Sequence, residues 1–334
     1  MHIVIIQNSS LPALKYGGTE RVIWYLGKEL VKMGHKVTYV AKGDSKCDFA
    51  DIIPFEKVSD IAKAIPKDAH LVHTHIPITE IPFENYQNIA VPVVFTLHGN
   101  INNYEELPKN TIFVSKNHAS RYGSDSFVYN GLDWNDYGNV DWNAQKKFFH
   151  FLGNGAWRVK NLRGAINLVK DIPNEKLYVF GGVRFNFNMG LRFTFTPKAR
   201  FFGLVDNEAK KKFLPHSKGL LFPVLWNEPF GLALIESLYF GNPVFGTPYG
   251  SLPELITSEV GFLSNRHSEL KEAMLDWQKF DRKTCHQYAK ENFNTEVMTK
   301  AYVEKYTRVL DGETLNPQKP KLIEIAPKFL PWNE

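Results

Sequence analysis

Short hydrophobic runs rich in branched and aromatic side chains alternate along this chain with stretches that carry apolar residues at helical spacing. This alternation is typical of βα units around a parallel sheet. The first half predicts strands at residues 2–7, 36–41, 70–75, 91–98, 111–115 and 126–130, with a helix near 19–33. The second half restarts the series and predicts strands at residues 147–153, 176–182, 199–205, 218–224, 242–247 and 260–264.

Two complete series indicate two domains, and 334 residues exceed what one hydrophobic core usually serves. The polar stretch 133–145 follows neither period and marks the boundary. We therefore expect an α/β protein of two Rossmann-like, doubly wound domains that face each other across a cleft. The expected division is residues 1–145, residues 146–295, and a helix with a proline-rich tail over 296–334 that packs back on the N-terminal domain.

Composition and charge narrow the function. Hydrophobic residues make up 43% and charged residues 22%, the balance of a soluble globular protein. The net charge of +5 comes from scattered cations, and the cluster Lys210, Lys211 and Lys212 is interpreted as a solvated helix face. Aromatic and basic residues do not interleave on one face, which argues against nucleic acid.

Cysteine usage and hydropathy predict that the protein is located in the reducing cytoplasm. Cys47 and Cys285 lie far apart and show no metal-ligand spacing, so neither a disulfide framework nor a zinc site is expected. The opening apolar run at residues 2–7 is too short for a signal peptide, and no apolar stretch approaches the roughly 20 residues that span a bilayer. Any membrane contact should be peripheral.

Two familiar nucleotide-binding motifs are absent. The loop after the first predicted strand lacks G-x-G-x-x-G, and the nearest match, residues 153–158, has Arg158 at its third glycine position. The P-loop pattern G-x-x-x-x-G-K-[ST] does not occur either. Dinucleotide binding and P-loop chemistry are therefore not predicted.

Residues 225–241 place two carboxylates, Glu228 and Glu236, around a predicted strand-to-helix turn. A helix is predicted from about Phe230 to Gly241, and the N–H groups of Gly231 and Leu232 at its start lack intrahelical partners, which makes a ready phosphate site. The spacing suits a nucleoside diphosphate, with ribose hydroxyls near Glu236 and a sugar beside Glu228. The alternative makes Glu228 a partner of the helix dipole and Glu236 a solvated helix residue.

The sequence E-P-F-G-x-x-x-x-E closely resembles the E-x7-E signature of the retaining glycosyltransferases of family 4, which have the GT-B fold. This resemblance extends over nearly the whole chain. It implies that the N-terminal domain holds the acceptor and that the C-terminal domain binds the nucleotide-sugar donor. Further similar segments lie in the same order at residues 16–37, 71–75, 95–99, 112–116, 128–133, 151–161, 201–205 and 246–256.

The resemblance also implies roles for individual residues. Glu236 would bind ribose hydroxyls, Glu228 would hold the hydroxyls of the transferred sugar, and Lys160 would neutralise the diphosphate. His98 would contact the donor sugar near the reacting centre, which makes His98, Glu228 and Lys160 the expected catalytic set. Backbone groups of Phe230, Gly231 and Leu232, and those of Gly17 and Gly18, would contact the donor.

Two positions depart from the family pattern. The family usually has Gly-Arg where this chain has Gly153–Asn154, so half of the expected cationic clamp is missing, and Arg158 is the candidate replacement. Ser251 stands where the family often has paired glycines. His73 and His75 share a strand face, yet no third ligand accompanies them, so structural or acceptor-rim roles are expected rather than a metal site.

The expected activity is therefore retaining, metal-independent transfer of a hexose, without a cofactor. The donor would be a nucleotide-diphosphate sugar, with a UDP-sugar preferred. The acceptor would be a glycan or lipid-linked saccharide in cell-surface polysaccharide synthesis, with the enzyme in the cytoplasm or peripherally on the inner membrane face. Two alternatives stay open: a sugar-nucleotide epimerase of the same fold, and a non-catalytic nucleotide-sugar binding protein.

Overall fold

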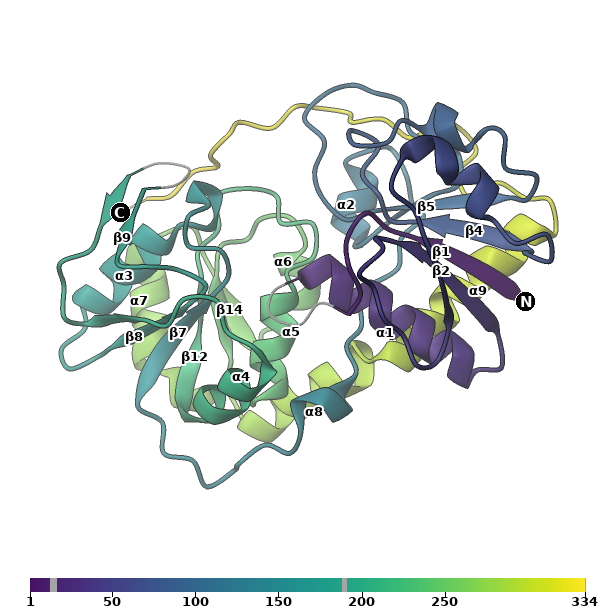
Figure 1. Cartoon of the computed structure of the whole chain (residues 1–334). Coiled ribbons are helices and arrows are strands. Elements are labelled where there is room, and N and C mark those ends of the chain that lie inside the picture. The colour runs from purple at the N-terminus through teal and green to yellow at the C-terminus, as the bar shows by residue number, and fades with distance from the viewer. Residues whose placement is uncertain (13–16, 188–190, 334) are drawn as a thin grey trace. The chain divides into compact units, whose positions relative to one another are not determined.

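The computed structural model describes residues 1–12, 17–187 and 191–333 (Figure 1). Packing divides the chain into two compact units. Unit 1 comprises Met1–Asp133 and Phe293–Ile325, and unit 2 comprises Trp134–Asn292 and Ala326–Glu334. Each unit contains its own parallel sheet, as the alternating pattern predicts. None of the helices in the described part of the chain is long and apolar enough to cross a membrane.

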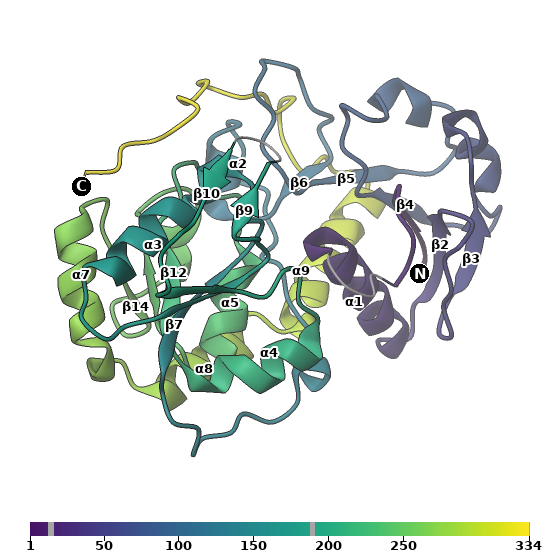
Figure 2. The same cartoon turned by 60° about the vertical axis from the view of Figure 1, so that its left-hand side comes forward.

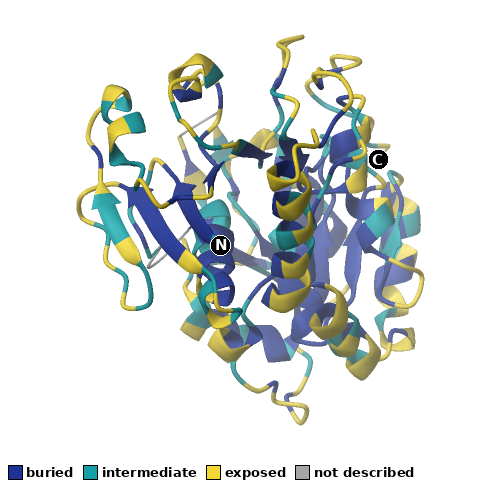
Figure 3. Ribbon diagram, turned by 90° about the vertical axis from the view of Figure 1, so that its right-hand side faces the viewer, coloured by how far each residue is buried: buried dark blue, intermediate teal, exposed yellow. Residues whose placement is uncertain are grey.

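Unit 1 is built around a parallel sheet in the order β3-β2-β1-β4-β5-β6. The order reverses between β1 and β4, which is the switch point of a doubly wound fold. Most of these strands are buried on both faces, and β3 is a half-exposed edge (Figure 3). The strands are β1 (His2–Ile6), β2 (Lys36–Ala41), β3 (Asp51–Pro54), β4 (Leu71–Thr74), β5 (Val93–Leu97) and β6 (Thr111–Phe113).

The helices of unit 1 cover this sheet with their apolar stripes. In α1, Val22, Leu26 and Leu30 are fully buried, while Lys28 and Lys32 are exposed. The last helix, α9, packs against α1, and its first turn is capped by the Asn294 side chain. The helices are α1 (Gly18–Lys32), α2 (Lys116–Ser120) and α9 (Thr295–Leu310), with short 3-10 turns at η1 (Val58–Asp60), η2 (Ala62–Ala64) and η3 (Phe83–Tyr86).

Unit 2 repeats the same topology, with the strand order β11-β8-β7-β12-β13-β14 and parallel pairing throughout. Its switch point lies between β7 and β12. A separate two-stranded antiparallel hairpin of β9 and β10 follows β8 (Figure 2). The strands are β7 (Phe148–Leu152), β8 (Leu177–Phe180), β9 (Phe185–Asn186), β10 (Arg192–Phe193), β11 (Ala199–Phe201), β12 (Ser217–Phe222), β13 (Val244–Gly246) and β14 (Gly261–Leu263).

The core of unit 2 is formed by aliphatic and aromatic side chains from β7, β8 and the helices packed on them. In α3, Leu162, Ala165 and Val169 are buried at helical spacing, and Asn161 caps the first turn. The helices are α3 (Leu162–Lys170), α4 (Asn207–Phe213), α5 (Leu232–Tyr239), α6 (Leu252–Leu255), α7 (His267–Leu275) and α8 (Arg282–Asn292), with 3-10 turns η4 (Trp134–Tyr137), η5 (Arg158–Lys160), η6 (Leu214–His216) and η7 (Trp277–Lys279).

The division between the units falls at residue 133 rather than at 145. The reason is that η4 packs on α5 within unit 2: the Trp134 ring stacks on Tyr239 with centroids 4.4 Å apart. The chain after α9 also divides. Residues up to Ile325 stay with unit 1, where Lys321 N donates to Tyr122 O, whereas residues 326–334 belong to unit 2.

Buried histidines make acid sensitivity a first testable property of the fold. His118 packs edge-on against the stacked Phe113 and Tyr122 rings, and burial, aided by the nearby charge of Arg121, lowers its pKa to about 3. The unfolded chain takes up this proton near pH 6.5, so the contribution to stability is complete above that pH. It is lost as the pH falls from about 6.5 towards 3, by up to about 1.4 kcal/mol per pH unit.

We therefore expect urea denaturation to give a lower unfolding free energy at pH 5 than at pH 7. The variant His118→Phe keeps an aromatic ring in the same position and removes the titrating group. It should reduce the pH dependence by about 1 kcal/mol per pH unit. An unchanged pH dependence in the variant would show that His118 does not titrate on unfolding.

Candidate functional site

The switch point of unit 2 brings together two loops that the sequence singles out. β7 and β12 are paired neighbours, so the loops at their carboxyl ends emerge side by side. We call residues 153–161, after β7, the basic loop, and residues 223–231, after β12, the carboxylate loop. Ligands of doubly wound folds bind at such a position. A backbone hydrogen bond of 2.7 Å from Leu225 N to Val159 O ties the two loops together.

Glu228 and Lys160 form a buried ion pair across these two loops. Lys160 Nζ lies 2.5 Å from Glu228 Oε2, and both side chains are almost fully buried. Trp226 Nε1 donates a second hydrogen bond to the same oxygen at 2.8 Å. The ammonium group also lies over the Phe222 and Trp226 rings, 5.2 and 5.0 Å from their centroids. The structure therefore joins in one ion pair two residues for which the sequence predicts separate roles.

The loop 247–251 holds the carboxylate loop in place. Ser251 N donates to Glu228 O at 2.9 Å, and Ser251 Oγ donates to Phe230 O at 2.7 Å. Gly250 lies directly against Glu228, because a Cβ at this position would be 2.2 Å from Glu228 N, and its φ of +62° favours glycine. Ser251 is thus an element that fixes the carboxylate loop.

The N-terminus of α5 follows this loop, as the sequence predicts, although the helix begins at Leu232 rather than near Phe230. Phe230 is buried and anchors the turn. Gly231 occupies the cap position with φ of +86°, and it provides no side chain to cap the first turn. The N–H groups at this end of the helix carry a positive partial charge. Gly231 and Leu232 are only half-buried, so this charge is accessible.

Glu236 lies in the middle of α5 and is only 2% exposed, so its interpretation as a solvated helix residue is wrong. Lys210 Nζ of α4 donates to Glu236 Oε1 at 2.6 Å, and Tyr137 OH donates to the same oxygen at 2.5 Å. Lys210 itself is 5% exposed. The prediction of a solvated lysine cluster is therefore wrong for Lys210, while Lys212 is exposed as expected.

Lys210, Tyr137 and Trp226 are site residues that sequence reasoning missed. A usable signal existed for Lys210, which lies four residues before the buried Leu214 and therefore on the inward side of its helix. Tyr137 lay in the polar stretch interpreted as a linker. Its contact with Glu236 joins residues 99 positions apart, which no local pattern indicates.

The expected replacement of the missing arginine by Arg158 stays a prediction. Asn154 Oδ1 accepts a hydrogen bond from Ala156 N, so this side chain caps a local turn within the basic loop. The exposed Arg158 guanidinium lies over the Phe329 ring, 5.1 Å from its centroid. Leu330 N donates to Leu225 O at 2.7 Å, so the end of the chain packs on both loops of the site.

In unit 1 the structure places the other predicted residues at the carboxyl ends of its strands. Gly17 and Gly18 lie at the start of α1, and Gly17 O accepts hydrogen bonds from Arg21 N at 3.2 Å and Arg21 Nε at 3.3 Å. The adjoining part of this predicted segment, Tyr16, lies outside the described residues. The predicted donor contacts of both glycines stay predictions.

His98 follows β5 and joins a row of histidines. His98 Nε2 and His75 Nδ1 share a hydrogen bond of 2.9 Å. Loss of hydration among the packed side chains lowers the pKa of His98 to about 4, and burial lowers the pKa of His75 and His73 well below the usual value. All three rings are therefore neutral at pH 7. His73 hydrogen-bonds Tyr306 and Thr96 at 2.7 Å each, a structural role that the sequence left open.

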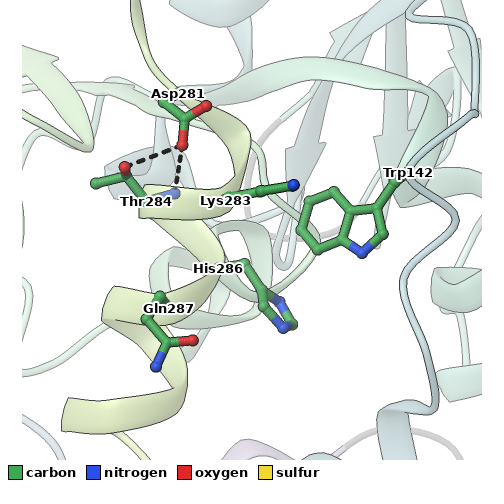
Figure 4. Close-up of a pocket in the computed structure, with 6 residues that line it drawn as sticks. All are labelled: Trp142, Asp281, Lys283, Thr284, His286 and Gln287. Atoms are coloured by element: carbon green, nitrogen blue, oxygen red, sulfur yellow. Dashed lines mark hydrogen bonds between the residues drawn. The ribbon is translucent and has the colours of Figure 1, made fainter.

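Within the described residues, no group of three or more histidine, cysteine or carboxylate side chains is arranged to hold a metal ion. Unit 2 also contains a surface pocket of about 490 Å³ (Figure 4). It contains none of the predicted site residues, and His286 in its wall is tied to the Tyr239 carbonyl. The pocket is lined by Trp142, Asp281, Lys283, Thr284, His286 and Gln287.

Known proteins resemble the chain in both fold and sequence. The structure of AviGT4, a glycosyltransferase involved in avilamycin A biosynthesis, matches with a TM-score of 0.74 and 18% identity over 93% of this chain and 98% of that one. The structure of HepE from Anabaena in complex with UDP-glucose matches with a TM-score of 0.68 and 14% identity over 94% and 100%. At these identities the likeness shows the fold, GT-B.

A sequence relative is an uncharacterized 41.2 kDa protein in the cps region of Klebsiella pneumoniae, 28% identical over 113 residues. That match spans 32% of this chain and 31% of the relative. Two family models match adjoining parts of the chain: "Glycosyltransferase Family 4" over residues 16–134 and "Glycosyl transferases group 1" over residues 134–295. With both halves matched and the GT-B fold present, the chain belongs to the GT-B glycosyltransferases of these two groups.

Proposed function

We propose that this glycosyltransferase moves a sugar from a nucleotide-diphosphate sugar to a hydroxyl with retention of the anomeric configuration. The observation that carries the proposal is the Glu228–Lys160 pair beside the N-terminus of α5, at the switch point of unit 2. It places an acceptor for sugar hydroxyls next to two sources of positive charge. A departing diphosphate needs such charge where it develops.

In this mechanism Lys160 and the N–H groups at Gly231 and Leu232 hold the diphosphate. Glu228 accepts hydrogen bonds from the hydroxyls of the transferred sugar. As the sugar–phosphate bond breaks, negative charge grows on the phosphate oxygen, and the same cationic groups stabilise it more strongly than in the ground state. The leaving phosphate oxygen accepts the proton of the incoming hydroxyl on the same face. No side-chain nucleophile, cofactor or metal is required.

The remaining assignments follow from the family resemblance. Glu236 contacts the ribose, held in place by Lys210 and Tyr137, and His98 contacts the donor sugar as a neutral ring. A UDP-sugar is the preferred donor, which the structure of HepE with UDP-glucose supports. The acceptor is a glycan or lipid-linked saccharide of cell-surface polysaccharide synthesis, and the enzyme works at the inner membrane face. The relative in the cps region supports the polysaccharide link alone.

Donor binding provides the first experiment. A thermal-shift screen of UDP-, GDP-, ADP- and dTDP-sugars in EDTA should show stabilisation by one donor class, because a bound ligand raises stability by mass action. Glu236→Gln keeps the shape of the side chain and weakens its charge-assisted bond to ribose, so calorimetry should show about tenfold weaker donor binding.

The exposed residue Glu272 of α7 supplies the matched control, since Glu272→Gln should leave donor binding unchanged. Wild-type affinity in Glu236→Gln would remove this residue from the donor site. Conversion of the donor's sugar in the absence of any acceptor would favour an epimerase, and binding of a donor without turnover of any acceptor would favour a binding protein.

A further inference from the structure

The hairpin of β9 and β10 exposes an unusual set of apolar side chains. We define the aromatic face as Val183, Phe185, Phe187, Leu191, Phe193 and Phe195. Phe187 is 69% exposed, Leu191 72% and Phe195 82%. Side chains of this kind are scattered singly on most protein surfaces, whereas these follow one another along one short element.

The register of the hairpin places these residues on the same side. Phe185 is paired with Phe193, and the hydrogen bond from Thr194 N to Arg184 O continues the same antiparallel register. Side chains alternate between the two faces of a strand, so every second residue from 183 and from 191 points the same way. The Phe187 and Phe193 rings are in contact, with centroids 5.6 Å apart. The aromatic face is therefore one continuous surface.

The opposite face of the hairpin is polar and packs inward. Asn186 and Thr194 are buried there, and Arg184 donates to the carbonyl oxygens of Thr194, Thr196 and Ala199. A solvated hairpin normally buries its apolar face and exposes its polar one. This hairpin does the reverse, and its polar contacts within unit 2 fix the aromatic face outward.

The segment that carries the aromatic face is positively charged, with Arg184 and Arg192 on the opposite side of the hairpin. From residue 176 to residue 205 the chain contains no aspartate or glutamate. The side-chain hydrogen bonds of Arg184 and Lys198 go to backbone carbonyls, and none of the hairpin's cations forms an ion pair with a described carboxylate. Their charges are therefore not neutralised locally. The cations of this segment are Lys176, Arg184, Arg192, Lys198 and Arg200.

From this combination we propose that the aromatic face docks on an anionic lipid membrane. Phenylalanine rings and leucine gain free energy by entering the acyl boundary. The net positive charge of the same segment is attracted by acidic headgroups over a Debye length of about 10 Å, so the cations need not lie on the aromatic face. A protein partner would also match the apolar side chains. The segment 176–205, however, has no acidic residue in 30 positions, and a surface of uniform negative charge complements it best. The proposal concerns lipid binding only and does not depend on the transferase reaction.

The test is co-sedimentation of the full chain with vesicles of phosphatidylethanolamine and phosphatidylglycerol, compared with phosphatidylcholine alone. The double variant Phe187→Ser/Phe195→Ser changes two exposed rings, so its unfolding transition should match the wild type. Its partition onto the acidic vesicles should fall at least about tenfold. The control Leu275→Ser removes an apolar side chain that is 58% exposed in the same unit and should bind as the wild type.

Salt provides the second measurement. Raising the salt from about 0.1 M to about 1 M shortens the Debye length from about 10 Å to about 3 Å and should weaken vesicle binding markedly. Failure to bind acidic vesicles, equal binding to phosphatidylcholine, or unchanged binding by the double variant would overturn the proposal. A double variant that loses self-association in sedimentation velocity while keeping its vesicle binding would instead assign the aromatic face to a second copy of the chain.

Discussion

Replacing Lys160 by alanine should reduce turnover by about 100- to 1000-fold, the range seen when one charge-stabilising donor is removed from an active site. Lys160 Nζ lies 2.5 Å from Glu228 at the carboxyl edge of the unit 2 sheet. In the proposed reaction its charge is most valuable when the diphosphate departs, so kcat should fall more than donor affinity does. Initial rates and calorimetric donor binding on the same preparation measure both quantities.

Two companion variants make this result interpretable. Lys218→Ala removes a lysine of the same unit that lies away from the predicted site and forms an ion pair with Glu175 at 2.5 Å. Turnover should remain near the wild-type value. Arg158→Ala should have a smaller effect than Lys160→Ala. If Lys160→Ala retains turnover and Arg158→Ala abolishes it, the cation assignment in the basic loop is displaced by two positions.

Replacing Lys210 by methionine should lower the free energy of unfolding by about 3–5 kcal/mol. Lys210 and Glu236 form a buried pair at 2.6 Å, and removing only the lysine leaves a carboxylate in a site that excludes water. Tyr137 still donates to that carboxylate, but one neutral hydrogen bond does not replace a positive charge. Urea denaturation monitored by circular dichroism gives the change directly.

The neighbouring Lys211 supplies a matched control, because its pair with Glu208 is on the surface and is worth about 0–1 kcal/mol. Lys210→Met combined with Glu236→Leu should recover much of the loss, since both charges are then removed together. A single variant Lys210→Met within about 1 kcal/mol of the wild type would contradict a buried, charged pair.

The sequence pattern predicts strands well where they are buried on both faces. The run at 36–41 coincides with β2, because each of its apolar residues lies in the interior of the sheet. The edge strand β3 was not predicted, because its residues Asp51–Pro54 are half-exposed and end in proline. The run at 126–130 is not a strand: only Phe127 forms a bridge, to Phe113.

In the candidate site, too, features set by neighbouring residues could be predicted, whereas contacts between distant residues could not. The carboxylate loop and the start of α5 could be predicted, because proline and glycine mark the turn and the apolar residues after it follow the helical period. The partners of the two carboxylates could not be found this way. Lys160 lies 68 positions from Glu228, and Lys210 lies 26 positions from Glu236, so only the folded sheet brings them together.

The sequence pattern did not predict the outward-facing hairpin either. Its arginines and phenylalanines interleave along the chain, but the strand register places them on opposite faces, so no single face carries both. The period of two predicts which residues share a face without indicating which face turns inward. The contacts of Arg184 with the backbone of unit 2 decide that question.

The central claim is metal-free transfer with retention at the anomeric carbon, and proton NMR of the reaction product tests it most directly. The full chain is incubated in EDTA with the donor selected by thermal shift and a pool of glycan and lipid-linked saccharide acceptors. We predict a new glycosidic linkage whose anomeric proton signal shows the donor's configuration. A product with the inverted configuration, or turnover that requires added magnesium or manganese, would contradict the account.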